Sequence, residues 1–235
     1  MKLGIIGAME QEVETLVSLL ENKRTVEYAG SLFCEGVLDG VDAVVVRCGI
    51  GKVNAALCVQ ILCDRFGVTH LVNTGIAGSL CSELDIGDLV ISRDAMYHDA
   101  QACVFGYPAG QVPGMPLTYE ADTQMVRLAV EAGESVNPGH CTVGRVASGD
   151  QFVSEKALKE QIIAITQALC TEMEGAAIAH AAYRNGIPFV IIRAISDKAD
   201  DSAEMDYPSF EAVAARRCAA VTRAFATLLK KKNAQ

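Results

Sequence analysis

Short apolar runs alternate with longer helical patterns along the chain, and this alternation limits the possible folds more than any other feature. Residues 189–195 and 2–7 are typical of buried strands, whereas Lys52 to Phe66 has helical spacing. Such alternation predicts a mostly parallel sheet between helices, and the hairpin turn Leu38-Asp39-Gly40 makes the sheet mixed. We therefore predict an α/β fold, a three-layer sandwich with a central mixed, mostly parallel sheet, in one domain over residues 1–235.

The remaining segments fit this scheme. Strands are expected within 25–48 and at 71–73, 88–92 and 141–148, and helices at 11–22, 121–134, 155–167 and 172–185. The strand at 71–73 runs into a glycine-rich turn at 74–78. Asp206 is expected to cap a last helix whose apolar stripe includes Phe210, Val213 and Phe225. Residues 98–120 are rich in Gly and Pro and predict a long loop, which is usually functional or an interface.

Composition excludes several classes of protein. The 29 acidic residues outnumber the 20 basic ones, for a net charge of −9, so a nucleic-acid partner is not expected. The nine cysteines include no C-x-x-C pair and no nearby histidine at ligand spacing, which argues against both a metal site and a disulfide framework. We expect a reducing, cytoplasmic location. No apolar run approaches the roughly 20 residues of a membrane span, and the first residues are expected to form a strand rather than a signal peptide.

Acidic residues stand beside the apolar runs. Asp197 follows the run 189–195, Glu12 follows the run 2–7, and Glu172 and Glu174 open the helix at 172–185. The carboxyl ends of the strands line the ligand crevice in an open α/β sheet. Carboxylates gathered there suggest a site that handles protons and hydroxyl groups.

Each acidic residue also has a simpler interpretation. Glu12 is placed like a first-turn carboxylate that the helix dipole favours. Glu174 stands three residues after Thr171, the spacing of a capping box, and Asp197 would cap a turn after its strand. Taken singly, these interpretations are the stronger ones. Residues 49–52 lack the spacing of a phosphate-binding loop.

Taken together, several short motifs resemble one family. They are Gly4-Ile5-Ile6-Gly7-Ala8-Met9-Glu10-x-Glu12, Gly49-Ile50-Gly51-Lys52-Val53, Asn73-Thr74-Gly75-x-Ala77-Gly78, Tyr97-His98-Asp99-Ala100, Phe105-Gly106-Tyr107, Ser148-Gly149-Asp150-x-Phe152, Glu172-Met173-Glu174 and Arg193-Ala194-Ile195-Ser196-Asp197-x-Ala199-Asp200. In this order and spacing, which extends from residue 2 to about 215, the set closely resembles the bacterial 5′-methylthioadenosine/S-adenosylhomocysteine nucleosidases of the nucleoside phosphorylase family.

The resemblance implies a homodimer that hydrolyses the N-glycosidic bond of 5′-methylthioadenosine and S-adenosylhomocysteine to adenine and the thioribosyl product, without metal or cofactor. Asp197 would be the acid that protonates adenine N7, Glu12 the base that activates water, and Glu174 the acceptor for the ribose hydroxyls. Two carboxyl groups that flank the scissile bond with room for water form the arrangement of an inverting glycosidase. General acid or base assistance is worth typically about 10²–10⁴ in rate.

The resemblance also assigns binding residues. Phe152 would stack on the purine and the backbone of Val153 would contact the base edge, while Tyr207 would lie against the sugar and its 5′ substituent. The other implied contacts within one subunit are Met9, Ile50, Gly78, Glu172, Met173, Arg193 and Ser196, of which Arg193 and Ser196 would support Asp197. Phe105 and Pro113 would come from the long loop of the neighbouring subunit.

Two departures from the family pattern bear on the substrate. Ile76 stands where the family often has Ser, and because Ile76 lacks a hydroxyl it favours water over phosphate as the nucleophile. Ala102 is smaller than the expected aliphatic residue and would widen the 5′ pocket. Three alternatives stay open: a nucleosidase for 6-amino-6-deoxyfutalosine, a phosphate-dependent phosphorylase, and a non-catalytic protein that binds adenine nucleosides.

Overall fold

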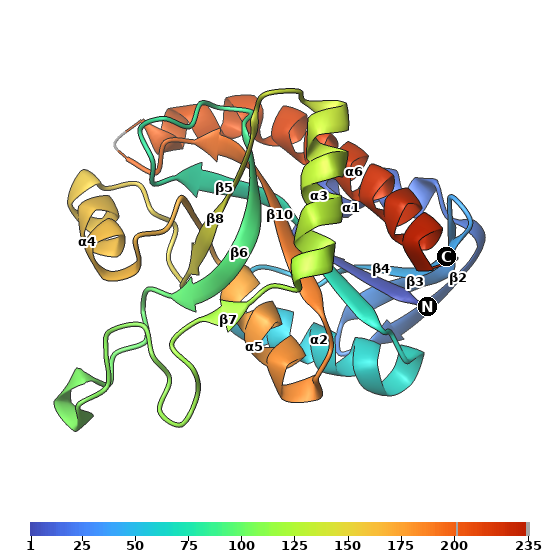
Figure 1. Ribbon diagram of the computed structural model, residues 1–235, viewed down its shortest axis with the longest axis horizontal. Coiled ribbons are helices and arrows are strands. Elements are labelled where there is room, and N and C mark those ends of the chain that lie inside the picture. The colour runs from blue at the N-terminus through green and yellow to red at the C-terminus, as the bar shows by residue number, and fades with distance from the viewer. Residues whose placement is uncertain (201, 234–235) are drawn as a thin grey trace.

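The computed structural model describes residues 1–200 and 202–233 (Figure 1). The strands are β1 (Leu3–Gly7), β2 (Glu21–Tyr28), β3 (Ser31–Leu38), β4 (Val41–Arg47), β5 (His70–Ser79), β6 (Leu89–Tyr97), β7 (Tyr119–Glu120), β8 (Cys141–Ser148), β9 (Cys170–Glu172) and β10 (Phe189–Asp197). The helices are α1 (Glu10–Ser18), α2 (Lys52–Phe66), the 3₁₀ helix η1 (Cys103–Phe105), α3 (Thr123–Val136), α4 (Lys156–Thr166), α5 (Gly175–Asn185) and α6 (Ala203–Asn233).

The strands form one mixed sheet, as predicted. Their order is β10-β6-β8-β9-β5-β1-β4-β3-β2, and β7 pairs with β6. Of the ten pairings between the described strands, five are parallel and five are antiparallel. Strand β5 also pairs with β10, so β5, β10, β6, β8 and β9 close into a ring. The sheet is therefore only partly open, whereas the sequence suggested an open sheet throughout.

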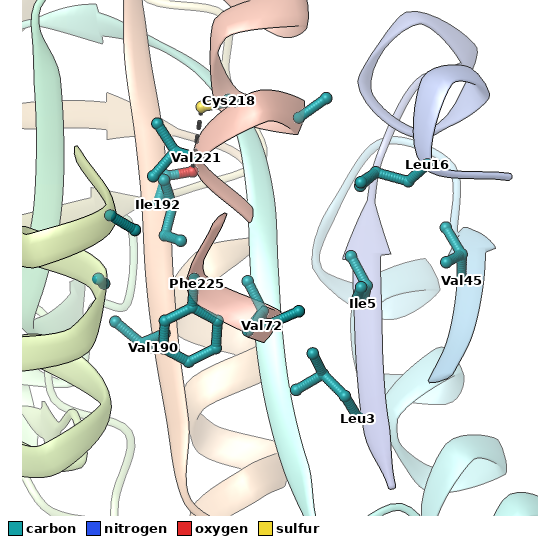
Figure 2. Close-up of a cluster of buried hydrophobic side chains, with 14 of the residues drawn as sticks. Leu3, Ile5, Leu16, Val45, Val72, Val190, Ile192, Cys218, Val221 and Phe225 are labelled. Carbon is teal, nitrogen blue, oxygen red and sulfur yellow. Dashed lines mark hydrogen bonds between the residues drawn. The ribbon is translucent and has the colours of Figure 1, made fainter. Parts of the chain in front are cut away.

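Helices cover both faces of the sheet and complete the three layers. The core on one face includes buried residues of α1, α3 and α6, and the core on the other face includes residues of α2 and α5. In Figure 1, α6 runs along the upper side of the sheet, and α2 and α5 lie below it. Figure 2 shows Leu3 and Ile5 of β1, Val72 of β5 and Phe225 of α6 in the first core. Removing this apolar surface from water drives the packing of the layers.

Several boundaries differ from the sequence prediction. Helix α1 ends at Ser18, and Glu21 and Asn22, expected at its end, belong to β2, because Glu21 pairs with Val37 in the hairpin with β3. Strand β5 continues through 74–78, which was expected to be a turn, because this segment pairs with β10. Glu172 ends a strand instead of opening a helix, since α5 begins only at Gly175.

The last helix also starts earlier than expected. It begins at Ala203, three residues before Asp206, whose side chain is outside the described part of the structure. Phe225 is buried as predicted, but Phe210 and Val213 are exposed, because this part of α6 packs on the core through Ala214 and Ala215 instead. No helix among the described residues is both long and apolar enough to cross a membrane.

The nine cysteines are free thiols, and five are buried. Burial raises the pKa of Cys48, Cys58, Cys170 and Cys218 above the ordinary value of a thiol. Because the thiolate is the reactive form of cysteine, these four side chains are chemically inert while the protein is folded. No cluster of three or more His, Cys, Asp or Glu side chains within the described ranges could hold a metal ion.

Candidate active site

A pocket opens where β1, β5, β9 and β10 end. It offers about 510 Å³ of space, part of it open to solvent, and a smaller cavity adjoins it. All of the residues predicted for the site within one subunit line one or both cavities: Met9, Glu12, Ile50, Gly78, Phe152, Val153, Glu172, Met173, Glu174, Arg193, Ser196, Asp197 and Tyr207.

Glu12 lies in the first turn of α1 and is almost completely buried. Its Oε2 accepts hydrogen bonds from the amide N–H groups of Ala8 (2.6 Å) and Met9 (2.9 Å), and its Oε1 accepts one from Ile76 (3.0 Å). Burial raises the pKa of Glu12, and the charge of Arg193 and the three amides oppose this shift. Glu12 is therefore a first-turn carboxylate of α1, as the simpler interpretation had it, and it also faces the pocket.

Arg193 of β10 lies at the centre of a buried charge cluster. Its Nη2 donates to Glu172 and to Oδ1 of Asn73 (2.5 Å), and its Nη1 donates to the carbonyl of Ile76 (3.1 Å). Carboxylate oxygens of Glu12 and Glu174 each lie 3.8 Å from the guanidinium. Burial alone would lower the pKa of Arg193, but the three carboxylates outweigh it and raise the pKa. The guanidinium is thus engaged with three glutamates.

Glu172 and Glu174 hold different positions in this cluster. Glu172 accepts hydrogen bonds from the Ser148 hydroxyl and from the amides of Glu174 and Gly175, so it is fully engaged by protein groups. Oε1 of Glu174 accepts from the amide of Gly51 at 2.8 Å, which links α5 to the start of α2. Burial and the nearby charge of Glu172 raise the pKa of Glu174.

The predicted capping box between Thr171 and Glu174 is not formed. Glu174 is the N-cap residue of α5, but its carboxylate accepts from Gly51 and makes no side-chain cap hydrogen bond. Thr171 lies in β9 and faces the pocket. The bend between strand and helix separates the two residues, so the spacing alone was misleading.

Asp197 ends β10 and is also buried. Its Oδ2 accepts a hydrogen bond from the Ser196 hydroxyl at 2.8 Å, and its Oδ1 accepts one from the amide of Ala199 at 2.8 Å. Its carboxylate leans over Gly78 of β5, where a Cβ atom would come within 2.8 Å of Oδ1. A glycine is therefore required at position 78 to leave this carboxyl group its place.

Apolar groups form the rim of the pocket. Phe152 is 49% exposed, and its ring meets that of Tyr207 edge to face with the centroids 5.6 Å apart. The Tyr207 hydroxyl donates to the Met9 sulfur at 3.1 Å. An exposed aromatic face at the mouth of a pocket can cover an aromatic ligand. Val153, by contrast, is buried in the smaller cavity.

The long loop lies away from this pocket in the same subunit. In Figure 1 residues 98–118 project at the lower left, and Val104 and Phe105 are 87% and 79% exposed. Phe105 and Pro113 line neither cavity, and Ala102, which we expected to widen the 5′ pocket, is buried beside η1 and also lies outside both. The loop therefore contributes no side chain to either cavity of its own chain.

The sequence did not point to four further residues that line the cavities: Ala8, Ala77, Gln151 and Thr171. Ile76, singled out for its missing hydroxyl, lines the larger one. Each of the four unpredicted residues directly precedes a predicted site residue in the chain. Strand alternation would have found Thr171 only if the pairing of β9 with β5 had been known.

Comparison with known proteins identifies the family of the chain. Residues 2–227 match the family model of the phosphorylase superfamily. The chain belongs to the phosphorylase superfamily. A relative named 5′-methylthioadenosine/S-adenosylhomocysteine nucleosidase, from Geobacillus thermodenitrificans (strain NG80-2), is 42% identical over 236 residues that cover 100% of both chains. This identity places the chain in the nucleosidase family within the superfamily, as predicted.

Two solved structures illustrate the range of this superfamily. The nucleosidase of Streptococcus pneumoniae, in complex with the transition-state inhibitor MT-ImmA, is 38% identical, has a TM-score of 0.93 and covers 97% of this chain and 100% of its own. The futalosine hydrolase of Helicobacter pylori strain 26695 is 32% identical, has a TM-score of 0.91 and covers 95% of this chain and 96% of its own. Membership of the nucleosidase family makes the protein an enzyme, a hydrolase of N-glycosidic bonds.

Proposed function

We propose that this protein hydrolyses 5′-methylthioadenosine and S-adenosylhomocysteine to adenine and the corresponding thioribosyl product. One observation supports this most directly: two buried carboxyl groups, Glu12 in the first turn of α1 and Asp197 at the end of β10, enter the same pocket. Hydrolysis of a glycosidic bond needs an acid on the leaving group and a base on water. A protein that only bound the nucleoside would need neither.

Asp197 is the acid in this proposal. As the bond between C1′ and N9 breaks, its electron pair passes to the adenine, and Asp197 delivers a proton to N7, so that the base leaves as neutral adenine. The hydroxyl of Ser196 and the amide of Ala199 hold the carboxyl group in one orientation. The proton that Asp197 loses must be replaced from solvent before the next turnover.

Glu12 is the base. Water attacks C1′ of the sugar, and Glu12 takes the proton that this water loses. Three amide donors and the nearby Arg193 favour the ionised form of the carboxyl group, while burial raises its affinity for a proton. A base is most effective when its pKa lies near the working pH, so the raised pKa of Glu12 suits this role.

The sugar binds between Met173 and the buried glutamates. Glu174 keeps one oxygen beside Arg193 and the other on the Gly51 amide, so its free acceptor positions face the pocket and can take the ribose hydroxyls. Arg193 acts here as a positioning residue, because it ties three glutamates to one strand. The adenine ring lies against Phe152, with its edge at the backbone of Val153.

We also propose a homodimer in which the loop of one subunit closes the pocket of the other through Phe105 and Pro113. An exposed apolar surface runs from the pocket along α2: Ile50 lines the pocket, and Val53 and Leu57 follow at helical spacing. Exposed apolar patches of this kind mark protein interfaces. Mixing Glu12→Gln with Phe105→Ala chains tests the arrangement, because each mixed dimer would contain one intact site and recover activity that both variants lack.

The function itself is tested by adenine release from 5′-methylthioadenosine in phosphate-free buffer. We expect turnover without phosphate, and a loss of about 10²–10⁴ in kcat for Glu12→Gln or Asp197→Asn. Turnover only after phosphate is added would identify a phosphorylase and contradict the argument from Ile76. Full activity of Glu12→Gln would remove that residue from the mechanism.

A second candidate substrate is 6-amino-6-deoxyfutalosine. The likeness to the Helicobacter pylori futalosine hydrolase favours it, at 32% identity over 95% of this chain. The two reactions break the same kind of bond, so one site could serve both. Comparison of kcat/KM for the two nucleosides with the same enzyme preparation decides which is preferred.

A further inference from the structure

One buried polar atom at the site has no partner in the protein. Thr171 of β9 is only 5% exposed, and within residues 1–200 and 202–233 its Oγ1 makes no hydrogen bond. The side chain lines both cavities. An unpaired buried hydroxyl destabilises a fold, and Val would fill the same volume without this cost. The hydroxyl is thus placed where a ligand can satisfy it.

The sheet puts Thr171 and Asp197 on opposite sides of Gly78. Thr171 pairs with Gly78 across β9 and β5, and Asp197 pairs with Gly78 across β10 and β5. Directly paired residues point to the same face of a sheet. Gly78 has no side chain to separate them, and the Asp197 carboxylate already leans over it. A flat ring that lies over Gly78 therefore has one edge at Asp197 and the opposite edge at Thr171.

The chemistry of adenine then selects one ring atom. Its ring nitrogens that can accept hydrogen bonds are N1, N3 and N7. In the proposed function, Asp197 protonates N7, and the backbone of Val153 contacts the edge that carries N1. N3 lies on the remaining edge, beside the bond to the sugar, and Thr171 directly precedes Glu172, a member of the cluster that surrounds the ribose.

We propose that the Thr171 hydroxyl donates a hydrogen bond to N3 of the bound adenine, which makes Thr171 a specificity residue for purines with a nitrogen at this position. This inference rests on the proposed function. The bond forms equally with substrate and product, so it contributes to binding more than to kcat.

The test is calorimetric binding of adenine and of 3-deazaadenine to the full chain and to two variants, Thr171→Val and Thr171→Ser. One hydrogen bond corresponds to about 3- to 10-fold in affinity. We expect Thr171→Val to weaken adenine binding by this factor and to leave 3-deazaadenine unchanged, and Thr171→Ser to retain the preference of the wild type. Binding of 7-deazaadenine is the matched control, since Thr171→Val should weaken it as much as it weakens adenine.

Other results separate the two proposals. If Thr171→Val weakens adenine and 3-deazaadenine equally, or neither, the contact to N3 is wrong, whatever the enzyme hydrolyses. Unchanged 3-deazaadenine affinity shows at the same time that the variant is folded. Binding of adenine with the expected pattern, but no release of adenine from 5′-methylthioadenosine, would overturn the proposed substrate and leave the contact standing. If adenine does not bind the wild type, the contact to N3 is wrong, and release of adenine from 5′-methylthioadenosine still decides the proposed function.

Discussion

Replacing Gly75 by Ala would test the buried charge cluster directly. Gly75 lies in the middle of β5, where a Cβ atom would come within 2.2 Å of Glu12 Oε1 and 2.4 Å of Arg193 Nη1. Its backbone does not have a positive φ, so the effect of the methyl group is steric. The two charged groups occupy the space that a side chain would need.

The size of the displacement follows from these distances. Ordinary contacts begin at 3.4 Å, so Glu12 Oε1 must move by about 1.2 Å and Arg193 Nη1 by about 1.0 Å. Glu12 would then lose its 3.0 Å hydrogen bond from Ile76. A misplacement of about 1 Å can lower the rate by about 10²-fold. Crowding a packed core costs typically about 1–3 kcal/mol of stability.

The assay is kcat for adenine release from 5′-methylthioadenosine, together with the unfolding midpoint. The matched control is Gly144→Ala in β8, because a Cβ atom there would also meet a neighbour at 2.2 Å, namely Leu169, which lines neither cavity. We expect both variants to lose stability and only Gly75→Ala to lose about 10²-fold in kcat. A folded Gly75→Ala enzyme with the kcat of the control would refute the link between this glycine and the position of Glu12.

Three further predictions concern protons and hydrogen bonds. Because the base must be ionised and burial raises the pKa of Glu12, the acid limb of kcat/KM should lie above pH 4.5, and a pH–rate profile with an acid limb at or below that value would contradict it. The raised pKa of Glu174 means that the folded protein binds its proton more tightly than the unfolded chain. The free energy of unfolding should therefore fall as pH rises from 5 to 9, and Glu174→Gln should reduce this fall by on the order of 1–3 kcal/mol in denaturant titrations. Ser196→Ala removes one hydrogen bond to Asp197 and should lower kcat by about 2- to 10-fold in steady-state assays, with the unfolding midpoint measured alongside.

The parts of the fold that local patterns determine could be predicted from the sequence. Helix α2 and strand β8 have the predicted bounds, because continuous periodicity and flanking turn residues specify both. The turn at Asp39 and Gly40 was also correct, and both residues have the positive φ that a tight hairpin needs. Acidic residues after apolar runs indicated the site because strand ends meet at one edge of the sheet.

Features that depend on distant pairing could not be predicted. The closure of β5, β10, β6, β8 and β9 into a ring joins segments up to 119 residues apart, such as Gly78 and Asp197, and no local pattern records it. The same is true of Arg193, whose partners come from three other segments of the chain. The glycines in 74–78 misled the sequence prediction, because glycine is common in turns. Here Gly75 and Gly78 lie in a strand, and the lack of a side chain makes room for the side chains of neighbouring residues.

The ring of strands has a mechanical consequence for the site. Asp197 and Glu172 end strands of the ring, where no member can slide without breaking its pairing on the other side. Glu12 follows β1, in the wing of the sheet that continues to the edge strand β2. The two proposed catalytic carboxyl groups are thus attached to different parts of the sheet, the closed ring and the open wing, and the Arg193 side chain on β10 reaches from the ring to Glu12. Amide hydrogens of β9 and β10 should then exchange only when the whole molecule opens, and those of β2 much sooner.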